Sequence, residues 1–242
     1  MIKRSNVYQN DFSYPLARIL NISSKGLDKR ASVELKKEGS SPLLEKIAEL
    51  EPKEGHTPVL MVPMGAQEVY GPNRNADGWP RQKCVKYAKN GKKVVIDSGL
   101  IENHPTFVTN AYIYKEHNNK DPKQASGIIA LSNYNPKVDR VEVVSQVDSD
   151  KWAEELGVIE KYGMTGVSMA ANVSEDLCSI CGNSAKSPSD YCSHIKLAKN
   201  SVLSDGSQVI MVNNNPTFID LSGVKEPADR IGYGLGTVSV QV

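Results

Sequence analysis

The chain has 242 residues, 39% of them apolar, which is enough to form one sizeable hydrophobic core. Its formal net charge is only +1, because 29 basic residues nearly balance 28 acidic ones, and this balance disfavours nucleic acid or an anionic membrane as a partner. No apolar run has the length of a membrane span or forms a secretory signal, which indicates an intracellular protein.

The first 55 residues are polar and mixed, and we expect them to form an N-terminal helical arm. Residues 42–50 carry apolar side chains at positions 43, 44, 47 and 50, a spacing typical of a helix. The proline-bounded run 58–63 predicts a first core strand near the edge of a sheet. Residues 71–80 are dense in turn formers and predict a long loop. Residues 56–242 are expected to form the main domain.

The next part of the chain predicts strands at 106–114, 127–134 and 140–147, where β-branched and aromatic residues gather. The last two should form a hairpin, because turn-forming residues connect them.

A helix follows, with Asp150 as its expected N-cap and Gly163 just past its end. Three apolar side chains of this helix share one face: Trp152, Leu156 and Ile159.

The remaining strands are predicted around Ser168 and at 207–212, 217–224 and 237–242. With seven or eight strands and two or three helices, we predict a mainly β fold with peripheral helices (α+β), built on a closed or partly open β-barrel.

The cysteines predict a metal site. Two residues separate Cys178 from Cys181, ten more precede Cys192, and one residue separates Cys192 from His194. Three thiolates and an imidazole in two tight pairs suit a tetrahedral structural zinc, and with four protein ligands such a metal would not activate water. We therefore predict a zinc knuckle inserted at residues 174–205. The alternative is three buried or free thiols beside an unrelated histidine. Cys84 is predicted to be a core residue.

His117 and Ser168 are candidates for a catalytic base and nucleophile. His117 stands where a predicted strand gives way to a polar loop, and strand ends are rigid yet accessible. Ser168 has small neighbours but lacks the Gly-x-Ser-x-Gly pattern, since position 170 is alanine. An imidazole that takes the serine proton is the pairing of a serine protease. The alternatives are an exposed loop histidine and a core or edge serine.

Several short motifs, in this order, resemble the prohead (head maturation) serine proteases of tailed bacteriophages, which share the fold of the herpesvirus assemblins. The resemblance covers roughly residues 58–235. Its motifs are the polar loop 73–78 with Thr106-Phe107, the run 116–122 followed by Gly127, the Val-rich strand 140–147, residues 163–170, and the segment 218–229.

This resemblance implies that Ser168 attacks the scissile carbonyl, that His117 serves as base and then as acid, and that a third residue orients the imidazole. We assign the third role to Asp220. The family often has glutamate at this position, and the assemblins have histidine. His194, 26 residues after Ser168, is the rival, but a zinc ligand cannot also orient a base.

The resemblance also points to backbone oxyanion donors in the loop at Ala228, Asp229 and Arg230, where Arg230 would hold a water or fix the loop. The implied function is a serine endopeptidase that cleaves scaffold and major capsid proteins, and itself, inside the immature capsid in the host cytoplasm. A homodimer is a further expectation, because dimerisation activates the assemblins; nucleic acid and membrane are not expected. The end of the chain after a β-like segment suggests a processed or truncated form.

Two other functions stay open from the sequence. The first is a catalytically inactive, zinc-stabilised structural protein of the capsid or prohead core. The second is a knuckle that contacts nucleic acid, which the balanced charge disfavours.

Overall fold

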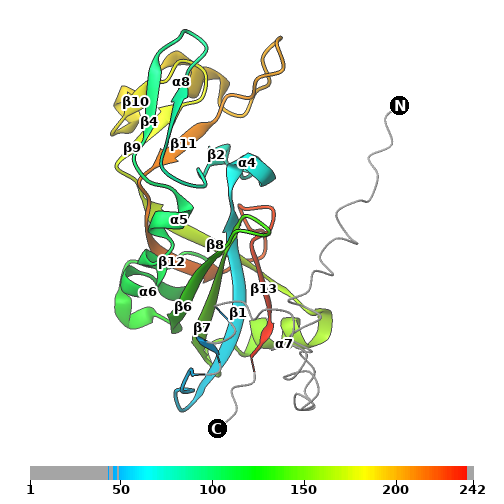
Figure 1. The fold of residues 1–242 in the computed structure, drawn as a ribbon. Helices are drawn as coiled ribbons and strands as arrows, with labels where there is room; N and C mark the ends of the chain where they lie inside the picture. Colours follow the sequence, from blue (N-terminus) through cyan, green and yellow to red (C-terminus); the bar gives the residue numbers. More distant parts are fainter. Residues whose placement is uncertain (1–42, 44–45, 48, 239–242) are drawn as a thin grey trace, which may run out of the picture.

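Seven strands form a closed barrel in the order β1-β13-β8-β12-β5-β6-β7 (Figure 1). The computed structural model describes residues 43, 46–47 and 49–238. All neighbouring barrel strands are antiparallel except β12 and β5, which are parallel. The barrel strands are β1 (His56–Gly65), β5 (Tyr112–Lys115), β6 (Gly127–Asn135), β7 (Arg140–Asp148), β8 (Thr165–Asn172), β12 (Thr217–Gly223) and β13 (Tyr233–Thr237). The prediction of a mainly β fold with a barrel is confirmed.

The helices in the described part of the chain are short. They are α4 (Gln67–Tyr70), α5 (Leu100–Asn103), α6 (Thr106–Asn110), α7 (Ala153–Tyr162) and α8 (Ser193–Ala198), with 3-10 turns at Pro122–Gln124 and Pro188–Asp190. Among the described residues, no helix has the length and apolar character needed to cross a bilayer.

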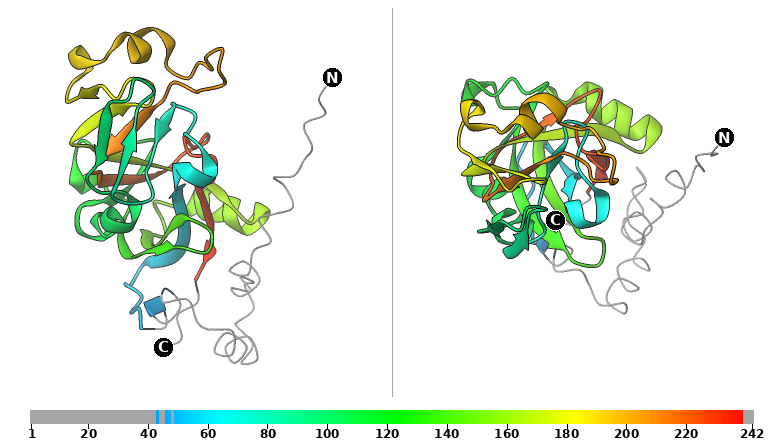
Figure 2. Two further views of the ribbon diagram at one scale, coloured as in Figure 1. Left: turned by 45° about the horizontal axis from the view of Figure 1, so that its top comes forward. Right: turned by 90° about the horizontal axis from the view of Figure 1, so that it is seen from above.

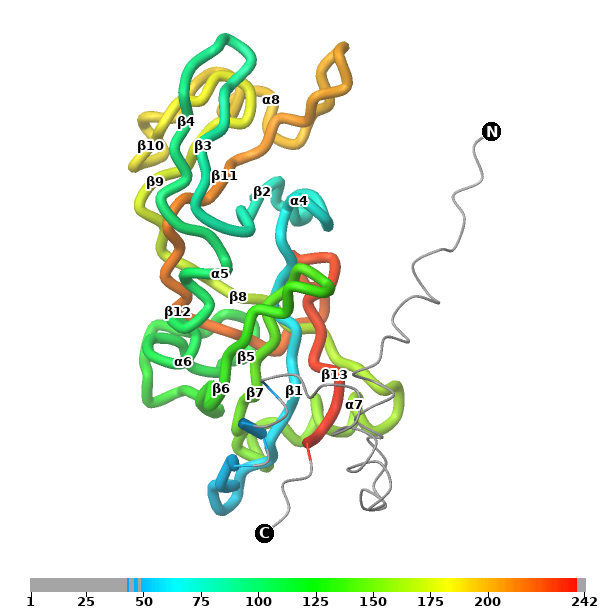
Figure 3. The backbone as a smooth tube through the Cα atoms, viewed as in Figure 1, coloured from blue at the N-terminus to red at the C-terminus, as the bar shows by residue number. Residues whose placement is uncertain are grey.

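A second part of the molecule, which we call the lobe, consists of residues 77–96 and 175–214 and stands at one end of the barrel (Figures 1 and 2). Its main sheet has the order β10-β9-β11-β2, and β3 and β4 form a separate hairpin. These two segments lie side by side although they are far apart in sequence (Figure 3). The lobe strands are β2 (Asp77–Gly78), β3 (Cys84–Tyr87), β4 (Lys93–Ile96), β9 (Glu175–Cys178), β10 (Ser184–Ala185) and β11 (Met211–Asn214).

The lobe therefore includes elements beyond the predicted knuckle at 174–205. Strand β2 and the β3–β4 hairpin were not predicted, and β2 interrupts the loop expected at 71–80. Cys84 is half-buried and packs with Ile96 and Leu177 of the lobe, not with the barrel core.

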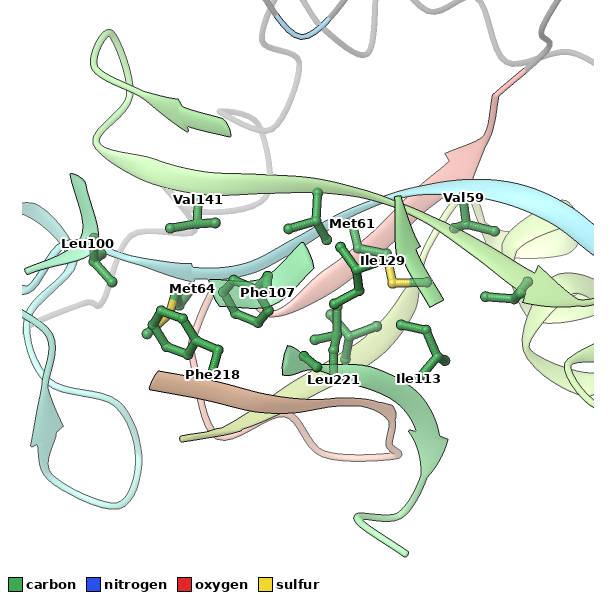
Figure 4. Close-up of a cluster of buried hydrophobic side chains, with 14 of the residues drawn as sticks. Val59, Met61, Met64, Leu100, Phe107, Ile113, Ile129, Val141, Phe218 and Leu221 are labelled. Carbon is green, nitrogen blue, oxygen red and sulfur yellow. The ribbon is translucent and has the colours of Figure 1, made fainter. Parts of the chain in front are cut away.

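The barrel core is built around two stacked rings, Phe107 and Phe218, whose centroids lie 4.1 Å apart (Figure 4). Both rings are fully buried, as are Val167 of β8 and Leu221 of β12. Since side chains alternate across a strand, the residues that follow them, Ser168 and Ser222, face the outside of the barrel wall.

Strand β12 has an irregularity that changes which residues face the core. Phe218 and Leu221 both belong to the core, although their positions differ by three and residues on one face of a regular strand differ by an even number. The pairing of β12 with β8 shifts register between Phe218 and Asp220, as in a β-bulge. Because of this shift, Asp220 faces outward together with Ser222.

The prediction of a strand at 106–114 was wrong over its first half. Residues 106–110 form α6, and only β5 is extended. Pro105 precedes the helix, and the hydroxyl of Thr106 bonds to the carbonyl of Asn103, 2.7 Å away. In this helix Phe107 reaches the core, so burial outweighs the β-propensity of the sequence.

The predicted hairpin of β6 and β7 is confirmed, but the prediction that β1 lies near the edge of a sheet is wrong. β1 pairs with β13 on one side and β7 on the other, so it has no free edge in the barrel. Its Pro63 lies between Met61 and Met64, where the pairing with β7 changes register, and a bulge tolerates the missing N–H.

The helix predicted after residue 150 is confirmed as α7, and Gly163 ends it in the left-handed conformation, with φ 80°. Asp150 is not its cap. The side chain of Asp148 instead accepts the backbone N–H groups of Asp150 and Lys151, each at 3.1 Å.

The other differences lie at element boundaries. The strand expected at 207–212 is formed at 211–214, and β13 at 233–237 begins before the strand expected at 237–242. Residues 239–242 and most of the predicted N-terminal arm lie outside the described residues. Within that arm, Leu43 and Ile47 are helical and pack on an outer apolar patch of the barrel formed by Leu60, Val144 and Val238.

We expect Phe218→Ala to lower the free energy of unfolding by about 3–5 kcal/mol, because it removes a fully buried stacked ring. Urea denaturation measures the effect. The control is Ile128→Ala, at a barrel position that is 42% exposed, which should cost less than about 1 kcal/mol. Equal losses in the two variants would contradict the placement of Phe218 in the core.

Candidate active site and metal cluster

A buried carboxylate holds the imidazole of His117. Nδ1 of His117 lies 2.8 Å from Oδ2 of Asp220, whose side chain has no exposed surface. The same Oδ2 accepts the amide of Asn119 at 2.8 Å, and Oδ1 accepts the hydroxyl of Ser222 at 2.6 Å. Three donors thus stabilise a charge that would otherwise be costly to bury.

The turn after β5 brings His117 to this carboxylate. Gly223 of β12 pairs with Lys115 at the end of β5, and its carbonyl accepts the N–H of Glu116 at 3.0 Å. Glu116 and His117 then reverse the chain with φ of 47° and 55°, a left-handed conformation that is strained for residues with a side chain. The N–H of His117 donates to Oγ of Ser222 at 3.3 Å.

Ser168 lies on β8, directly opposite Ser222 of β12. Cβ atoms of opposed residues in an antiparallel pair are about 5 Å apart, so Ser168 is a close neighbour of the serine that contacts His117. Within the described part of the chain, the hydroxyl of Ser168 forms no hydrogen bond. Its oxygen is therefore available to another group.

Ser168 and His117 line the same cleft, which has a volume of about 690 Å³. The barrel contributes Met169 and Ala171 to its wall, and the lobe contributes residues from three of its strands: Asp77, Asp176, Met211 and Asn213. The candidate pair thus lies where the barrel meets the lobe.

One edge of β8 faces this cleft. β13 pairs with β8 only at Thr165 and Gly166, so among the described strands none covers that edge further along. Met169, Ala170 and Ala171, which continue the strand past Ser168, line the cleft. An extended peptide has room to add here as a further strand.

The position of the proton on the His117 ring, and the direction in which its pKa is shifted, both follow from its partner Asp220. An ionised carboxylate only accepts hydrogen bonds, so Nδ1 carries a proton and Nε2 of the neutral ring is a base. The hydrogen bond to Asp220 raises the pKa of His117 above its ordinary value of 6.5, burial opposes this, and the charges of Asp220 and Glu116 raise it further.

The loop predicted to supply oxyanion donors borders the cleft only in part. Ala228 lines the cleft, its carbonyl accepts the N–H of Arg74 at 2.9 Å, and its own N–H forms no backbone hydrogen bond among the described residues. Asp229 is buried and bonds the N–H of Ile231 at 3.1 Å, which shapes the loop, and burial raises its pKa to about 6. Arg230 is exposed and does not line the cleft.

Two glycines allow this loop to cross β8 closely. A Cβ on Gly166 would lie 2.4 Å from the carbonyl oxygen of Val224, and one on Gly232 would lie 2.4 Å from that of Val167. Any larger residue at either position would push the loop away from the strand.

In the lobe, Cys178, Cys181, Cys192 and His194 form one cluster whose ligand atoms all lie within 4.8 Å of one another. Sγ of Cys192 is 3.5 Å from Sγ of Cys181 and 3.8 Å from Nδ1 of His194. Ligands of a tetrahedral zinc, with Zn–S bonds of about 2.3 Å, lie roughly 3.8 Å apart. The cluster therefore has the donors and the spacing for one metal ion.

The thiols of this cluster differ in acidity. Burial raises the pKa of Cys178 to about 12. Burial acts in the same direction on Cys192, but the N–H of Ile195 and the neighbouring Cys181 and His194 lower its pKa to about 7. A bound cation would favour the thiolate form of all the cysteine ligands.

No protein-family model, curated protein or solved structure matches the chain.

Of the residues that the sequence analysis selected, Ser168 and His117 line the cleft, Asp220 is buried behind His117, and His194 lies with the cysteines. Asn119 and Ser222, which hold Asp220, were missed as site residues. Each stands two positions after a selected residue, and for Ser222 the period of a strand would have placed it beside Asp220.

We expect His117 to titrate above pH 6.5 in the folded protein and Asp220→Asn to lower this pKa, because the amide lacks the negative charge. A pKa raised by folding means that the pair adds stability at low pH, and that this stability is lost as the pH rises through the raised pKa. Imidazole NMR signals report the titration. His104, whose pKa burial lowers, is the internal control and should not move. An unchanged His117 in the variant would contradict the assigned hydrogen bond.

Proposed function

We propose that the protein is a serine endopeptidase with Ser168 as nucleophile, His117 as base and Asp220 as the residue that orients the base. The observation that carries the proposal is the 2.8 Å contact between His117 and a fully buried Asp220, in a cleft that Ser168 also lines.

In the proposed reaction, Nε2 of His117 takes the proton of Ser168 as Oγ attacks the scissile carbonyl. The imidazolium that forms is stabilised by Asp220 through Nδ1. His117 then donates its proton to the leaving amine, and a water completes the hydrolysis of the acyl-enzyme by the same route. The backbone N–H of Ala228 is our candidate donor to the oxyanion.

The substrate is proposed from the site and from the resemblance together. The uncovered edge of β8 suits an extended peptide segment, such as a flexible terminus or linker. From the resemblance to prohead proteases we propose scaffold and major capsid proteins as substrates, with cleavage inside the immature capsid and self-cleavage by the protease. Dimerisation, as in the assemblins, belongs to the same proposal.

We propose zinc as the ion of the metal cluster. Cys178, Cys181, Cys192 and His194 would fill all its positions, so the ion would stabilise the lobe and take no part in hydrolysis. Because the lobe also contributes residues to the cleft wall, the metal would help to shape the substrate site.

A fluorophosphonate probe tests the nucleophile without knowledge of the substrate, because it reacts with activated serines. We expect the probe to label Ser168 in the wild type and to leave Ser168→Ala and His117→Ala unlabelled. The peptidase activity of each variant should fall at least about 10⁴-fold. Mass spectrometry identifies the labelled peptide, and co-expression with scaffold and capsid proteins from the same genome measures cleavage.

The matched control is Ser132→Ala. Ser132 also contacts a histidine, since its Oγ is 2.9 Å from Nδ1 of His104, but among the described residues no carboxylate bonds to that ring, and neither residue lines the cleft. This variant should keep full labelling. A folded wild-type protein that neither reacts with the probe nor cleaves any candidate would favour the inactive structural protein instead.

For the metal, we expect one zinc per chain and its loss in Cys181→Ser or His194→Ala, with a fall in the melting temperature. Elemental analysis and thermal unfolding measure the two effects. Cys84→Ser is the control, since Cys84 lies outside the cluster, and it should retain the zinc. Metal-free protein with unchanged thermal stability would contradict a structural zinc.

A further inference from the structure

The β3–β4 hairpin has a strongly uneven charge. Residues 81–96 contain six basic residues and no acidic one, in a chain whose net charge is only +1. The basic residues are Arg81, Lys83, Lys86, Lys89, Lys92 and Lys93. All five lysines are exposed, so this part of the lobe carries a concentrated positive charge.

The face of the hairpin that points to solvent also carries an aromatic ring. Tyr87 is 72% exposed and pairs across the hairpin with Lys93. The adjacent pair on the same face is Val85 and Val95, which are 51% and 40% exposed. Lysines alone would protect the edges of a small sheet from aggregation, but an exposed ring flanked by valines has the opposite effect.

The opposite face of the hairpin is fixed to the lobe. Cys84, Val94 and Ile96 pack against Leu177 and Val212 of the main lobe sheet. The solvent-facing side chains are therefore presented on a rigid support.

The tip of the hairpin meets the segment that holds the metal cluster. The N–H of Lys89 bonds to the carbonyl of Ile180 at 3.2 Å, and the side-chain amide of Asn90 bonds to the carbonyl of Cys181 at 3.2 Å. Figure 3 shows this tip at the far end of the lobe, away from the barrel. The hairpin and the cluster thus form one continuous region.

Some of the hairpin lysines are already paired within the chain. Lys86 forms an ion pair with Glu68 and Lys89 with Asp205. Among the described residues, no acidic partner is found for Lys83, Lys92 or Lys93. These three charges and the ring of Tyr87 remain available to a ligand.

We propose that the solvent-facing side of the β3–β4 hairpin, together with the exposed Lys92 at its tip, binds single-stranded nucleic acid. Lys83, Lys92 and Lys93 contact the phosphate backbone, and Tyr87 stacks on a base. A surface of lysines without an aromatic ring would serve an acidic polypeptide equally well. The exposed Tyr87 beside Lys93 favours a ligand that combines regular negative charge with flat rings.

Fluorescence anisotropy of the full chain with a labelled oligothymidine of 20 nucleotides tests the proposal over a range of salt concentrations. The variant with Lys83, Lys92 and Lys93 each changed to Gln should bind more than tenfold more weakly, and the slope of log affinity against log salt should shrink by about 2, since single strands give roughly 0.7 per contact. Tyr87→Ala should weaken binding by about tenfold with an unchanged slope.

The control variant changes Lys123, Lys137 and Lys161 to Gln, three exposed lysines on the barrel side of the molecule. It should bind like the wild type. Thermal unfolding checks that each variant remains folded. Three results would overturn the proposal: no binding at low salt, an equal loss in the control variant, or competition by polyglutamate as strong as by unlabelled oligothymidine.

Discussion

The candidate site depends on the burial of one charge. Asp220 has no exposed surface, so its oxygens need donors from the protein, and the imidazole of His117, the amide of Asn119 and the hydroxyl of Ser222 supply them. Two of these donors come from the strained turn after β5 and one from β12 itself. The parallel pairing of β12 with β5, the one parallel pair in the barrel, brings that turn to the carboxylate. Loss of any donor would leave part of a buried charge unpaired, which is far more costly than loss of a surface contact.

The lobe links three features that the sequence presents separately. Its sheet contributes Asp176 and Met211 to the cleft, its loops gather the metal ligands, and its hairpin carries the excess of lysines. Tyr191 connects two of them directly, because it packs beside the cluster and donates its hydroxyl to Asp176 at 2.6 Å. Tyr191 is therefore one direct contact between the metal cluster and the wall of the cleft. In the proposed enzyme, a metal bound at this cluster would therefore help to shape the peptide site.

Local signals in the sequence predicted much of this structure. The β6–β7 hairpin, helix α7 with Gly163 at its end, and the grouping of three cysteines with His194 all follow from spacing and turn chemistry over short distances. The errors arose where distant contacts decide the outcome. Residues 106–110 have strand-like composition, but Phe107 reaches Phe218 only from a helix. The β3–β4 hairpin has so many lysines that no core-facing pattern stands out, and its buried side chains meet strands more than eighty residues away. Asn119 could not be recognised as a site residue from the sequence, because its partner, Asp220, is remote in the chain.

The register shift in β12 places the core residue Phe218 and the site residues Asp220 and Ser222 on opposite faces of one short strand. Before the shift, Phe218 is selected for its fit to the barrel interior; after it, Asp220 and Ser222 are selected for their bonds at the cleft. With strict alternation, Asp220 would share the side of Phe218, and either the carboxylate would enter the apolar interior or the ring would leave it. Ile219 supplies the additional residue that avoids this conflict. A substitution at 218 therefore acts on the core and leaves the acid on the cleft side, while Ile219 is the residue that keeps these two side chains on opposite faces of the strand.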